Sequence, residues 1–383
     1  MKQLTIFLLT LSFITSCNKD KDITPIPGLQ PTYFTFNGQI GTNDNSTLIS
    51  SDGNLIICGN SGGNLSILKI TKAGAQVWRK DFGAGNGSFA SGIVASSSNE
   101  LFICGKTYRN YSTKRNDVLL IKTTSYGDTI WTKTYGGIES EYGTNIIATS
   151  DGNLLISGKT ESFGAGTFGD LYLIKVNTNG DTLWTRSYPD QGQEVPFHLM
   201  ETQNGEYLVT GTNEENSNPR ELYLLKVSKG GGQIWNKKIG PATWKWGYST
   251  IELSNGDLLT CGEHTTSGYS QVLLVKTDNL GNVIWEKEFG DNHLSEQGNS
   301  IKQNADGTFI ITGSSYDATS GQTGIILLKV DQSGNQLWLK KFGSSSSGSG
   351  VNLIKDINDD NIITGNYNGS IFMTKTDNNG VYK

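Results

Sequence analysis

The chain has 383 residues and a formal net charge of −5, from 31 Lys and Arg against 36 Asp and Glu. It is long for one ordinary domain but normal for a closed repeat array, and no Lys/Arg run interrupts its repeats, so we expect neither a second domain nor a nucleic-acid partner. Gly is abundant at 48 residues, whereas Pro and Met are scarce at 7 and 3. Aromatic and β-branched residues fill short runs, and this composition predicts an all-β protein of many strands joined by tight turns.

The first residues have the pattern of a secretory signal. An apolar run from Leu4 to Ile14 follows Lys2 and is too short to span a bilayer. It ends in Ile14-Thr15-Ser16-Cys17, which resembles a bacterial lipobox, where the signal is cut before the cysteine and lipid is attached to it. The resemblance implies a signal peptide over residues 1–16 and lipidation of Cys17. The alternative is an ordinary cleaved signal with a chance cysteine.

A linker is expected over residues 17–35. Its charged tract, residues 18–22, is similar to the tag that follows the lipidated cysteine in surface-exported lipoproteins of the Bacteroidota, although charged, solvated linkers are common at such positions. Pro25, Pro27 and Pro31 stiffen the rest of the linker. We therefore expect a protein anchored by lipid to the bacterial outer membrane and exposed at the cell surface.

A unit of roughly 50 residues then recurs seven times, and each unit carries four strand signals. Its first turn, expected as a two-residue hairpin, has Asp-Gly or Asn-Gly in five units, whereas the units with Asn99 and Asp359 depart from this pattern. A second turn carries Gly in every unit, and Trp follows four residues later in the first six units. These residues are Gly74, Gly127, Gly180, Gly231, Gly281, Gly334 and Gly380, with Trp78, Trp131, Trp184, Trp235, Trp285 and Trp338.

The last unit lacks its outer strand, because only Val381-Tyr382-Lys383 follows Gly380. The segment Phe36–Ile40 aligns with the outer strand Trp235–Ile239 of another unit. We predict that this N-terminal strand completes the last blade, because such closure removes the open end of the array. The sequence thus predicts a monomeric seven-bladed β-propeller of four-stranded blades over residues 36–383.

The Gly and Trp pattern, with a preceding Leu-Leu-Lys or Leu-Ile-Lys strand, resembles bacterial tandem propeller repeats of the PQQ-like type. The resemblance implies the fold and leaves the function open, because such repeats serve assembly scaffolds, adhesins and enzymes. Quinoprotein dehydrogenases usually have eight units and a disulfide of adjacent cysteines over the cofactor, and this sequence has no Cys-Cys pair. We therefore expect no PQQ and no other cofactor.

Residues that recur in every unit are expected to be structural, because seven copies around a ring cannot all serve one ligand. The clearest case is a lysine of the third strand, at Lys69, Lys122, Lys175, Lys226, Lys276, Lys329 and Lys375. Glu141, Glu194 and Glu296 recur where the innermost strands of three units begin. They could supply glycosidase chemistry or a calcium site, but acids that accept hydrogen bonds from loop amides explain the recurrence at least as well.

The remaining cysteines, Cys58, Cys104 and Cys261, precede the Gly that ends an equivalent strand in different units. We interpret them as buried small residues and expect neither a disulfide framework nor a metal site.

Function is expected where the repeats differ. In a propeller, both tight turns of each blade lie on one face, and the longer loops between the second and third strands share the other face with the inter-blade loops. That variable face carries Tyr108, Tyr111, Phe163, Phe168 and the atypical insertion of residues 241–248. The candidate ligand-binding residues there are Trp244, Trp246, Tyr248, His264, Tyr269 and His293.

Clustered Trp and Tyr side chains suit stacking on sugar rings or anchoring a protein partner. The alternative for Trp244 or Trp246 is that it fills a gap between blades. The histidines, His198, His264 and His293, lack short metal spacing. The leading hypothesis is therefore a non-catalytic module that binds a glycan or a protein. A scaffold subunit of an envelope complex, and a polysaccharide lyase or hydrolase that uses Glu194 or Glu296 with a histidine, remain as alternatives.

Overall fold

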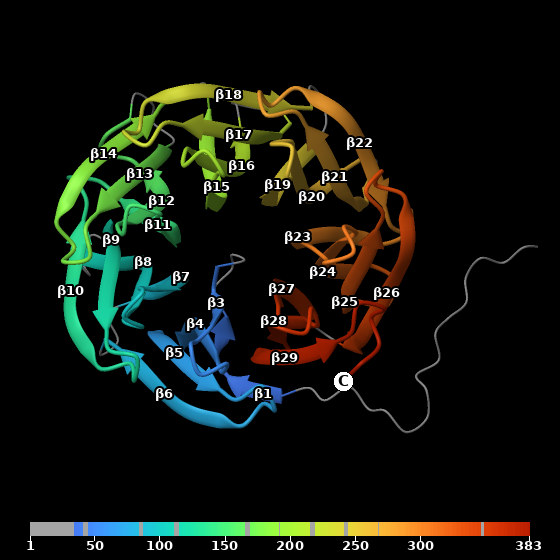
Figure 1. Cartoon of the computed structure of the whole chain (residues 1–383), viewed down its shortest axis with the longest axis horizontal. Helices are drawn as coiled ribbons and strands as arrows, with labels where there is room; N and C mark the ends of the chain where they lie inside the picture. Colours follow the sequence, from blue (N-terminus) through green and yellow to red (C-terminus); the bar gives the residue numbers. More distant parts are fainter. Residues whose placement is uncertain are drawn as a thin grey trace, which may run out of the picture. The chain divides into compact units, whose positions relative to one another are not determined.

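A computed structural model describes the chain from residue 34 onward, except for residues 41–44, 84–86, 111–114, 165–168, 191, 215–218, 241–243, 267 and 346–347. The strands form seven sheets arranged as blades around a central axis (Figure 1). This confirms the predicted all-β, seven-bladed propeller. The described residues form no helix, and hence no helix that could cross a membrane. Cys17 and the predicted linker up to residue 33 lie outside the described residues, whereas its last two residues, 34 and 35, belong to β1.

Each blade has four strand positions, and we number the blades 1 to 7 in chain order. The innermost strands are β2 (Gln39–Ile40) with β3 (Thr47–Ile49), β7 (Phe89–Ala95), β11 (Glu141–Ala148), β15 (Gln193–Glu201), β19 (Trp244–Glu252), β23 (Ser295–Gln303) and β27 (Gly348–Lys355). The second strands are β4 (Leu55–Ser61), β8 (Leu101–Asn110), β12 (Leu154–Thr160), β16 (Tyr207–Glu214), β20 (Leu258–Thr265), β24 (Phe309–Asp317) and β28 (Asn361–Tyr367). The third strands are β5 (Asn64–Ile70), β9 (Arg115–Thr123), β13 (Asp170–Val176), β17 (Glu221–Val227), β21 (Ser270–Thr277), β25 (Gln322–Val330) and β29 (Ser370–Thr376). The outermost strands are β6 (Gln76–Phe82), β10 (Thr129–Tyr135), β14 (Thr182–Tyr188), β18 (Gln233–Ile239), β22 (Val283–Phe289), β26 (Gln336–Ser345) and β1 (Phe34–Asn37).

The N-terminal strand closes the ring as predicted, although it is shorter than expected. Strand β1 pairs antiparallel with β29 and supplies the outermost strand of blade 7. The predicted strand continued to Ile40, and that part is wrong, because Gln39 and Ile40 pair with β4 of blade 1. Gly38, with φ of +132°, lies between the two segments. Glycine accepts this conformation readily, so the chain can leave the outer edge of one blade for the inside of the next.

The first tight turns contain one residue more than predicted. Ser50 N donates to Asn54 O at 2.8 Å, and Gly53 N donates to Ser50 O at 2.8 Å, so three residues separate the paired ends. Gly53 occupies the left-handed position with φ of +77°. In the two blades without this glycine, Asn99 and Asp359 adopt φ of +61°. Asn and Asp tolerate the left-handed region better than most residues, which explains why these blades keep the same turn.

The repeated Gly and Trp residues contact each other across blade junctions. A Cβ atom added to Gly180 of blade 3 would lie 2.8 Å from Cη2 of Trp131 of blade 2. The same contact recurs in the pairs Gly127 with Trp78, Gly231 with Trp184, Gly281 with Trp235, Gly334 with Trp285, and Gly380 with Trp338. The second turn of each of these blades therefore lies directly on the tryptophan of the preceding blade. This contact is a structural reason for the repeat.

The repeated lysines are also structural. In every blade the third-strand lysine forms an ion pair with an acid at the first tight turn. These pairs are Lys69–Asp52, Lys122–Glu100, Lys175–Asp151, Lys226–Glu206, Lys276–Asp257, Lys329–Asp306 and Lys375–Asp356. The Lys175 side chain also bonds the Thr149 and Tyr207 hydroxyls, each at 2.6 Å. Each lysine thus joins the end of the third strand to the turn between the first two.

The hydrophobic core is divided into clusters that lie between neighbouring blades. One cluster joins Phe102 and Val118 of blade 2 to Ile156, Tyr172 and Ile174 of blade 3. The three described cysteines, in blades 1, 2 and 5, are buried, as the sequence predicted. Because the core occupies the junctions, the inner ends of the strands and the loops are left to form surface features.

Candidate functional site

The strand β19 positions three of the six predicted site residues, Trp244, Trp246 and Tyr248. Trp244 pairs with Thr265 and Trp246 with Glu263 on β20, whereas Lys245 pairs with His264. Alternate residues of a strand point to opposite sides, so both tryptophans lie on one side and Lys245 and His264 on the other. The register shifts between Gly247 and Ser249, which makes Tyr248 the extra residue of a β-bulge. Bulges of this kind redirect a side chain.

The two tryptophans stack on each other. Their ring centroids are 5.9 Å apart with an interplanar angle of 25°. The guanidinium carbon of Arg220, from blade 4, lies 5.8 Å from the Trp244 ring and 5.4 Å from the Trp246 ring. Trp244 is 42% exposed and Trp246 is half-buried. Trp244 therefore does not fill a gap between blades, and the pair presents aromatic surface to solvent.

Acids next to the tryptophans fix their polar neighbours. Glu214 accepts a hydrogen bond from Arg220 at 2.8 Å, and Glu263 accepts one from the Tyr248 hydroxyl at 3.0 Å. The Tyr248 ring packs edge-on against Phe197 of blade 4, with centroids 5.1 Å apart. Burial, together with Glu263, raises the pKa of Tyr248 well above its ordinary value.

We call the cluster formed by Phe197, Arg220, Trp244, Trp246, Tyr248 and Glu263 the tryptophan site. Its members lie on β15, on β19 and β20, and just before β17. Sequence reasoning found Trp244, Trp246 and Tyr248 but missed the other three residues. The position of Glu263 could have been predicted from the repeat, because Glu263 directly follows the Gly that ends the second-strand motif and therefore stands opposite Trp246. Arg220 lies in a loop without a repeated counterpart, and nothing in the sequence indicated its position.

The other predicted residues form two separate groups. His264 is buried on the side of β20 away from the tryptophans, and its Nδ1 lies 2.6 Å from Glu288 Oε1. Tyr269 and His293 are exposed and contact each other edge-on at 6.5 Å. Of the four predicted loop aromatics, Phe163 is 47% exposed and packs on Tyr172, and Tyr108 packs against Gly87. Tyr111 and Phe168 lie outside the described residues.

The three recurring glutamates are fully buried and differ in their hydrogen bonds. Glu141 accepts bonds from Gly137 N at 2.9 Å, Thr160 Oγ1 at 3.0 Å and Ser162 N at 3.1 Å. Glu296 accepts one from Asp291 N at 2.8 Å and pairs with Lys341 at 2.9 Å. These contacts fix inter-blade loops, as the structural interpretation expected.

Glu194 is the exception among these acids. Its Oε1 accepts a bond from Asn213 Nδ2 at 2.5 Å, but no described residue donates a hydrogen bond to its buried Oε2. Burial and the nearby Asp170 and Asp190 raise the pKa of Glu194 to about 8. The side chain is 0% exposed. Within the described ranges, no group of three or more His, Cys, Asp or Glu side chains could hold a metal ion.

Comparison with known proteins identifies the family. A family model described as outer membrane protein assembly factor BamB matches residues 61–380. The chain belongs to this family. The matched range covers blades 2 to 6 completely, the two outer strands of blade 1, and the three strands β27 to β29 of blade 7. No curated protein matches this BamB-family chain.

Several solved structures share the fold at low identity. A puromycin hydrolase has a TM-score of 0.57 and 10% identity over 91% of this chain and 54% of its own, so the BamB-family chain spans about half the length of that enzyme. A polysaccharide lyase, the PL25 ulvan lyase bound to -[GlcA(1-4)Rha3S]-, has a TM-score of 0.61 and 11% identity, over 90% of this chain and 95% of the lyase. The Pan2 WD40 domain of Neurospora crassa has a TM-score of 0.50 and 9% identity, over 91% and 90%. At these identities the likeness shows the propeller fold alone.

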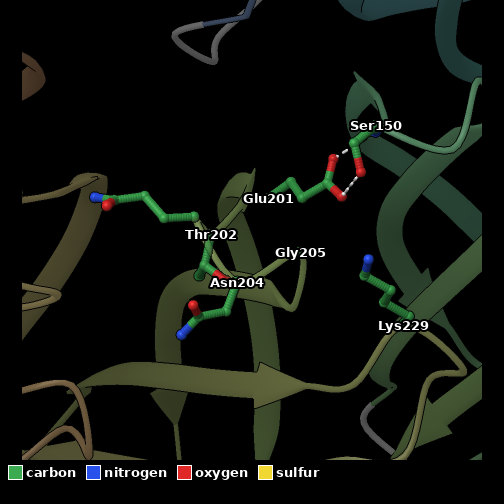
Figure 2. Close-up of a pocket in the computed structure, with 7 residues that line it drawn as sticks. Ser150, Glu201, Thr202, Asn204, Gly205 and Lys229 are labelled. Carbon is green, nitrogen blue, oxygen red and sulfur yellow. Dashed lines mark hydrogen bonds between the residues drawn. The ribbon is translucent and has the colours of Figure 1, made fainter.

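The tight-turn face of the BamB-family propeller carries a polar pocket of about 280 Å³ (Figure 2). It is lined by Ser150 of blade 3 and by residues 201–205 and Lys229 of blade 4. Glu201 accepts hydrogen bonds from Ser150 N at 2.7 Å and Ser150 Oγ at 2.6 Å. Glu252 of blade 5 accepts one from Gln203 N at 2.6 Å in the same way. These acids join the first turns of neighbouring blades, so the pocket walls are explained by ring assembly.

Proposed function

We propose that the chain is a non-catalytic binding module, anchored by lipid at Cys17 to the outer membrane, whose tryptophan site binds a glycan or a protein. The observation that carries this proposal is the stacked pair Trp244 and Trp246 with Arg220 over both rings. Large aromatic side chains left exposed together mark interaction sites more often than chance surface residues do. Two of the site residues, Phe197 and Arg220, come from blade 4, and the other four come from blade 5.

The chemistry of the tryptophan site suits a ligand with flat apolar faces and hydroxyl groups. The exposed face of Trp244 provides a stacking surface, and Arg220 and Glu263 provide a donor and an acceptor beside it. Sugar rings combine both properties, and so do the aromatic anchors of protein partners. The buried glutamates do not support the enzyme hypothesis, because none of the three reaches solvent.

The direction of β1 supports an orientation on the membrane. Phe34 pairs with Met373, and Asn37 pairs with Ser370 beside the loop between β28 and β29. The chain thus runs from the tight-turn side toward the variable face. Residues 18–35 span at most about 60 Å when extended. We infer that the tight-turn face lies toward the membrane and the tryptophan site points away from it. Proteolysis of the variable loops only after membrane solubilisation would contradict this orientation.

The test of the binding function is a glycan array with full-length protein and three variants. Trp244→Ala and Trp246→Ala should lose binding about 10-fold or more, the effect of removing a central aromatic anchor. Tyr126→Ala is the matched control, because Tyr126 is 70% exposed in a tight turn on the opposite face. Binding that survives both Trp substitutions, or is lost equally with Tyr126→Ala, would remove the tryptophan site as the binding surface.

A second candidate is a scaffold subunit of an envelope complex, favoured by the family match. This function predicts stable contacts with envelope proteins that do not need the tryptophan site. Cross-linking in cells followed by identification of the partners separates the two candidates. A scaffold keeps the same partners in Trp244→Ala, whereas a binding module that uses this site for a protein loses them.

A further inference from the structure

A second feature of the inner ring lies where blades 2 and 3 meet. Lys106 of β8 places its ammonium 5.1 Å from the Phe89 ring of β7 and 4.9 Å from the Tyr142 ring of β11. Phe89 stands directly opposite Lys106, and all three side chains are half-buried. The lysine is therefore held between aromatic faces from two neighbouring blades.

Lys106 differs from the other half-buried or buried lysines in its polar contacts. Lys175, Lys226 and Lys355, for example, each bond to a carboxylate. Among the described residues, Lys106 has neither a carboxylate within ion-pair distance nor a hydrogen-bond acceptor. No described residue therefore occupies its three N–H groups, although part of the side chain is buried. Burial lowers the pKa of Lys106, because the charged form is less well solvated there than in water.

The register places this group at the same level as the tryptophan site. In each of blades 2, 3 and 5, a residue of the innermost strand pairs with the glycine of the second strand, in the pairs Ala90–Gly105, Gly143–Gly158 and Gly247–Gly262. The aromatic residue comes directly before this paired position, and it is Phe89, Tyr142 and Trp246 in turn. Figure 1 shows β7, β11 and β19 among the innermost strands that surround the axis. In blade 5, the residue equivalent to Lys106 is Glu263. The aromatic positions are shared, but blade 2 has the positive charge of Lys106 where blade 5 has the acid Glu263.

We propose that Phe89, Lys106 and Tyr142 form a subsite for the carboxylate-bearing sugars of an acidic glycan, a polyuronate. A uronate ring offers C–H groups that pack on an aromatic face and a carboxylate that accepts charge-assisted hydrogen bonds from an ammonium. The two half-buried rings restrict the lysine, so less side-chain entropy is lost on binding. This inference rests on the proposed binding function and specifies its ligand class.

The test measures binding of alginate and polygalacturonate oligosaccharides to full-length protein by calorimetry. The matched ligands are the same oligosaccharides with their carboxyl groups reduced to alcohols. Loss of one charge-assisted hydrogen bond corresponds to about a 10- to 100-fold weaker Kd. We expect Lys106→Gln to lose this factor for the polyuronates and to bind the reduced ligands as the wild type does. Lys106→Arg should keep the preference for polyuronates. Lys229→Gln, which removes an exposed lysine of the tight-turn face, should change nothing.

The outcomes separate this inference from the binding function itself. If the protein binds acidic and reduced ligands equally, or if Lys106→Gln leaves polyuronate affinity unchanged, the subsite is overturned while glycan binding stands. If no glycan binds at all, both are overturned. Should Lys106→Gln fail to fold, NMR of wild-type protein with ¹³C-methylated lysines replaces it. There, polyuronate must raise the pKa of one lysine, and that signal must be absent from Lys106→Arg. An unchanged lysine titration would also reject the subsite.

Discussion

The contact between the repeated glycine and the tryptophan of the preceding blade can be tested with one pair of substitutions. Gly152 and Gly180 both belong to blade 3, and both have φ of +78°. A Cβ atom at Gly152 would meet nothing within 4 Å. At Gly180 it would lie 2.7 Å from Lys133 Cδ and 2.8 Å from Trp131 Cη2. The two Gly→Ala variants therefore share the backbone cost and differ in the contact with blade 2.

The expected magnitudes follow from these two terms. A left-handed alanine costs about 1–2 kcal/mol, and the stiffer unfolded chain returns about 0.4–1 kcal/mol. Gly152→Ala should thus lower the free energy of unfolding by about 1 kcal/mol. Gly180→Ala should add about 1–3 kcal/mol, because the Trp131 ring is held in the junction and must shift. With an unfolding entropy of about 2.1 cal/mol/K per residue, this excess corresponds to a Tm about 1–4 °C lower than that of Gly152→Ala.

Differential scanning calorimetry of wild type and both variants measures this difference. A second pair of variants tests whether the excess cost comes from the contact with Trp131. In a Trp131→Ala background, Gly180→Ala should lose most of its excess cost, because the ring that it overlaps is gone and the remaining close contact is with the flexible Lys133 side chain. Equal losses for Gly152→Ala and Gly180→Ala, or an excess that persists without Trp131, would show that the repeated pair does not join the blades.

Three further predictions concern buried charge and ring closure. Because Glu194 has a pKa of about 8 in the folded state, above its ordinary value of 4.5, the folded protein should lose stability as pH rises from about 4.5 to 8. Glu194→Gln should abolish this loss and stabilise the protein by up to about 4 kcal/mol at pH 8, whereas Glu141→Gln should destabilise it at every pH. Urea denaturation at pH 5 and pH 8 measures the free energy of unfolding of each protein. The same change in this free energy between the two pH values for wild type and Glu194→Gln would contradict the assignment of the pH dependence to Glu194. Lys175→Met should cost about 1–3 kcal/mol. Although burial opposes ionisation of Asp151, bonds from Thr149 and Lys175 lower the pKa of that carboxyl to about 2. The stabilisation that this shift supplies is present above an ordinary pKa of 3.8 and should fade in wild type as pH falls toward 2; it should be smaller in the variant, which keeps the Thr149 bond. Deleting residues 34–37 exposes the edge of β29, so this deletion should lower Tm and promote self-association, which light scattering detects. A control deletion of residues 22–25 should change neither property. If the protein without residues 34–37 stays monomeric with an unchanged Tm, β1 is dispensable for stability.

Much of the fold could be predicted because a repeat supplies the same information several times. The period of Gly and Trp located every blade, and its incomplete last copy indicated that the N-terminal strand closes the ring. The same reasoning was wrong at Ile40, where an alignment with Trp235–Ile239 extended the strand too far. Blade 7 is the only one whose outer strand comes from the other end of the chain. Its connection to blade 1 therefore has no repeated counterpart in the sequence.

The candidate site was predictable only in part. Trp244, Trp246 and Tyr248 were found because they break the repeat, and breaks in a repeat can be seen in the sequence. His264 also breaks it, but the alternation of β20 turns that side chain to the side away from the tryptophans. No sequence pattern indicated Lys106, because its aromatic neighbours Phe89 and Tyr142 come from two different blades.

The sequence by itself determined the number of blades, the order of their strands and the residues that hold them together, because each of these depends on local pattern and recurs along the chain. Only the tertiary structure decided which side chains meet at the junctions. It showed that Arg220 covers two tryptophans of the next blade, that Glu194 has fewer donors among the described residues than Glu141 has, and that Lys106 lies between two rings. These contacts join residues of neighbouring blades, and their geometry is set by how the blades pack around the axis, which no single repeat contains.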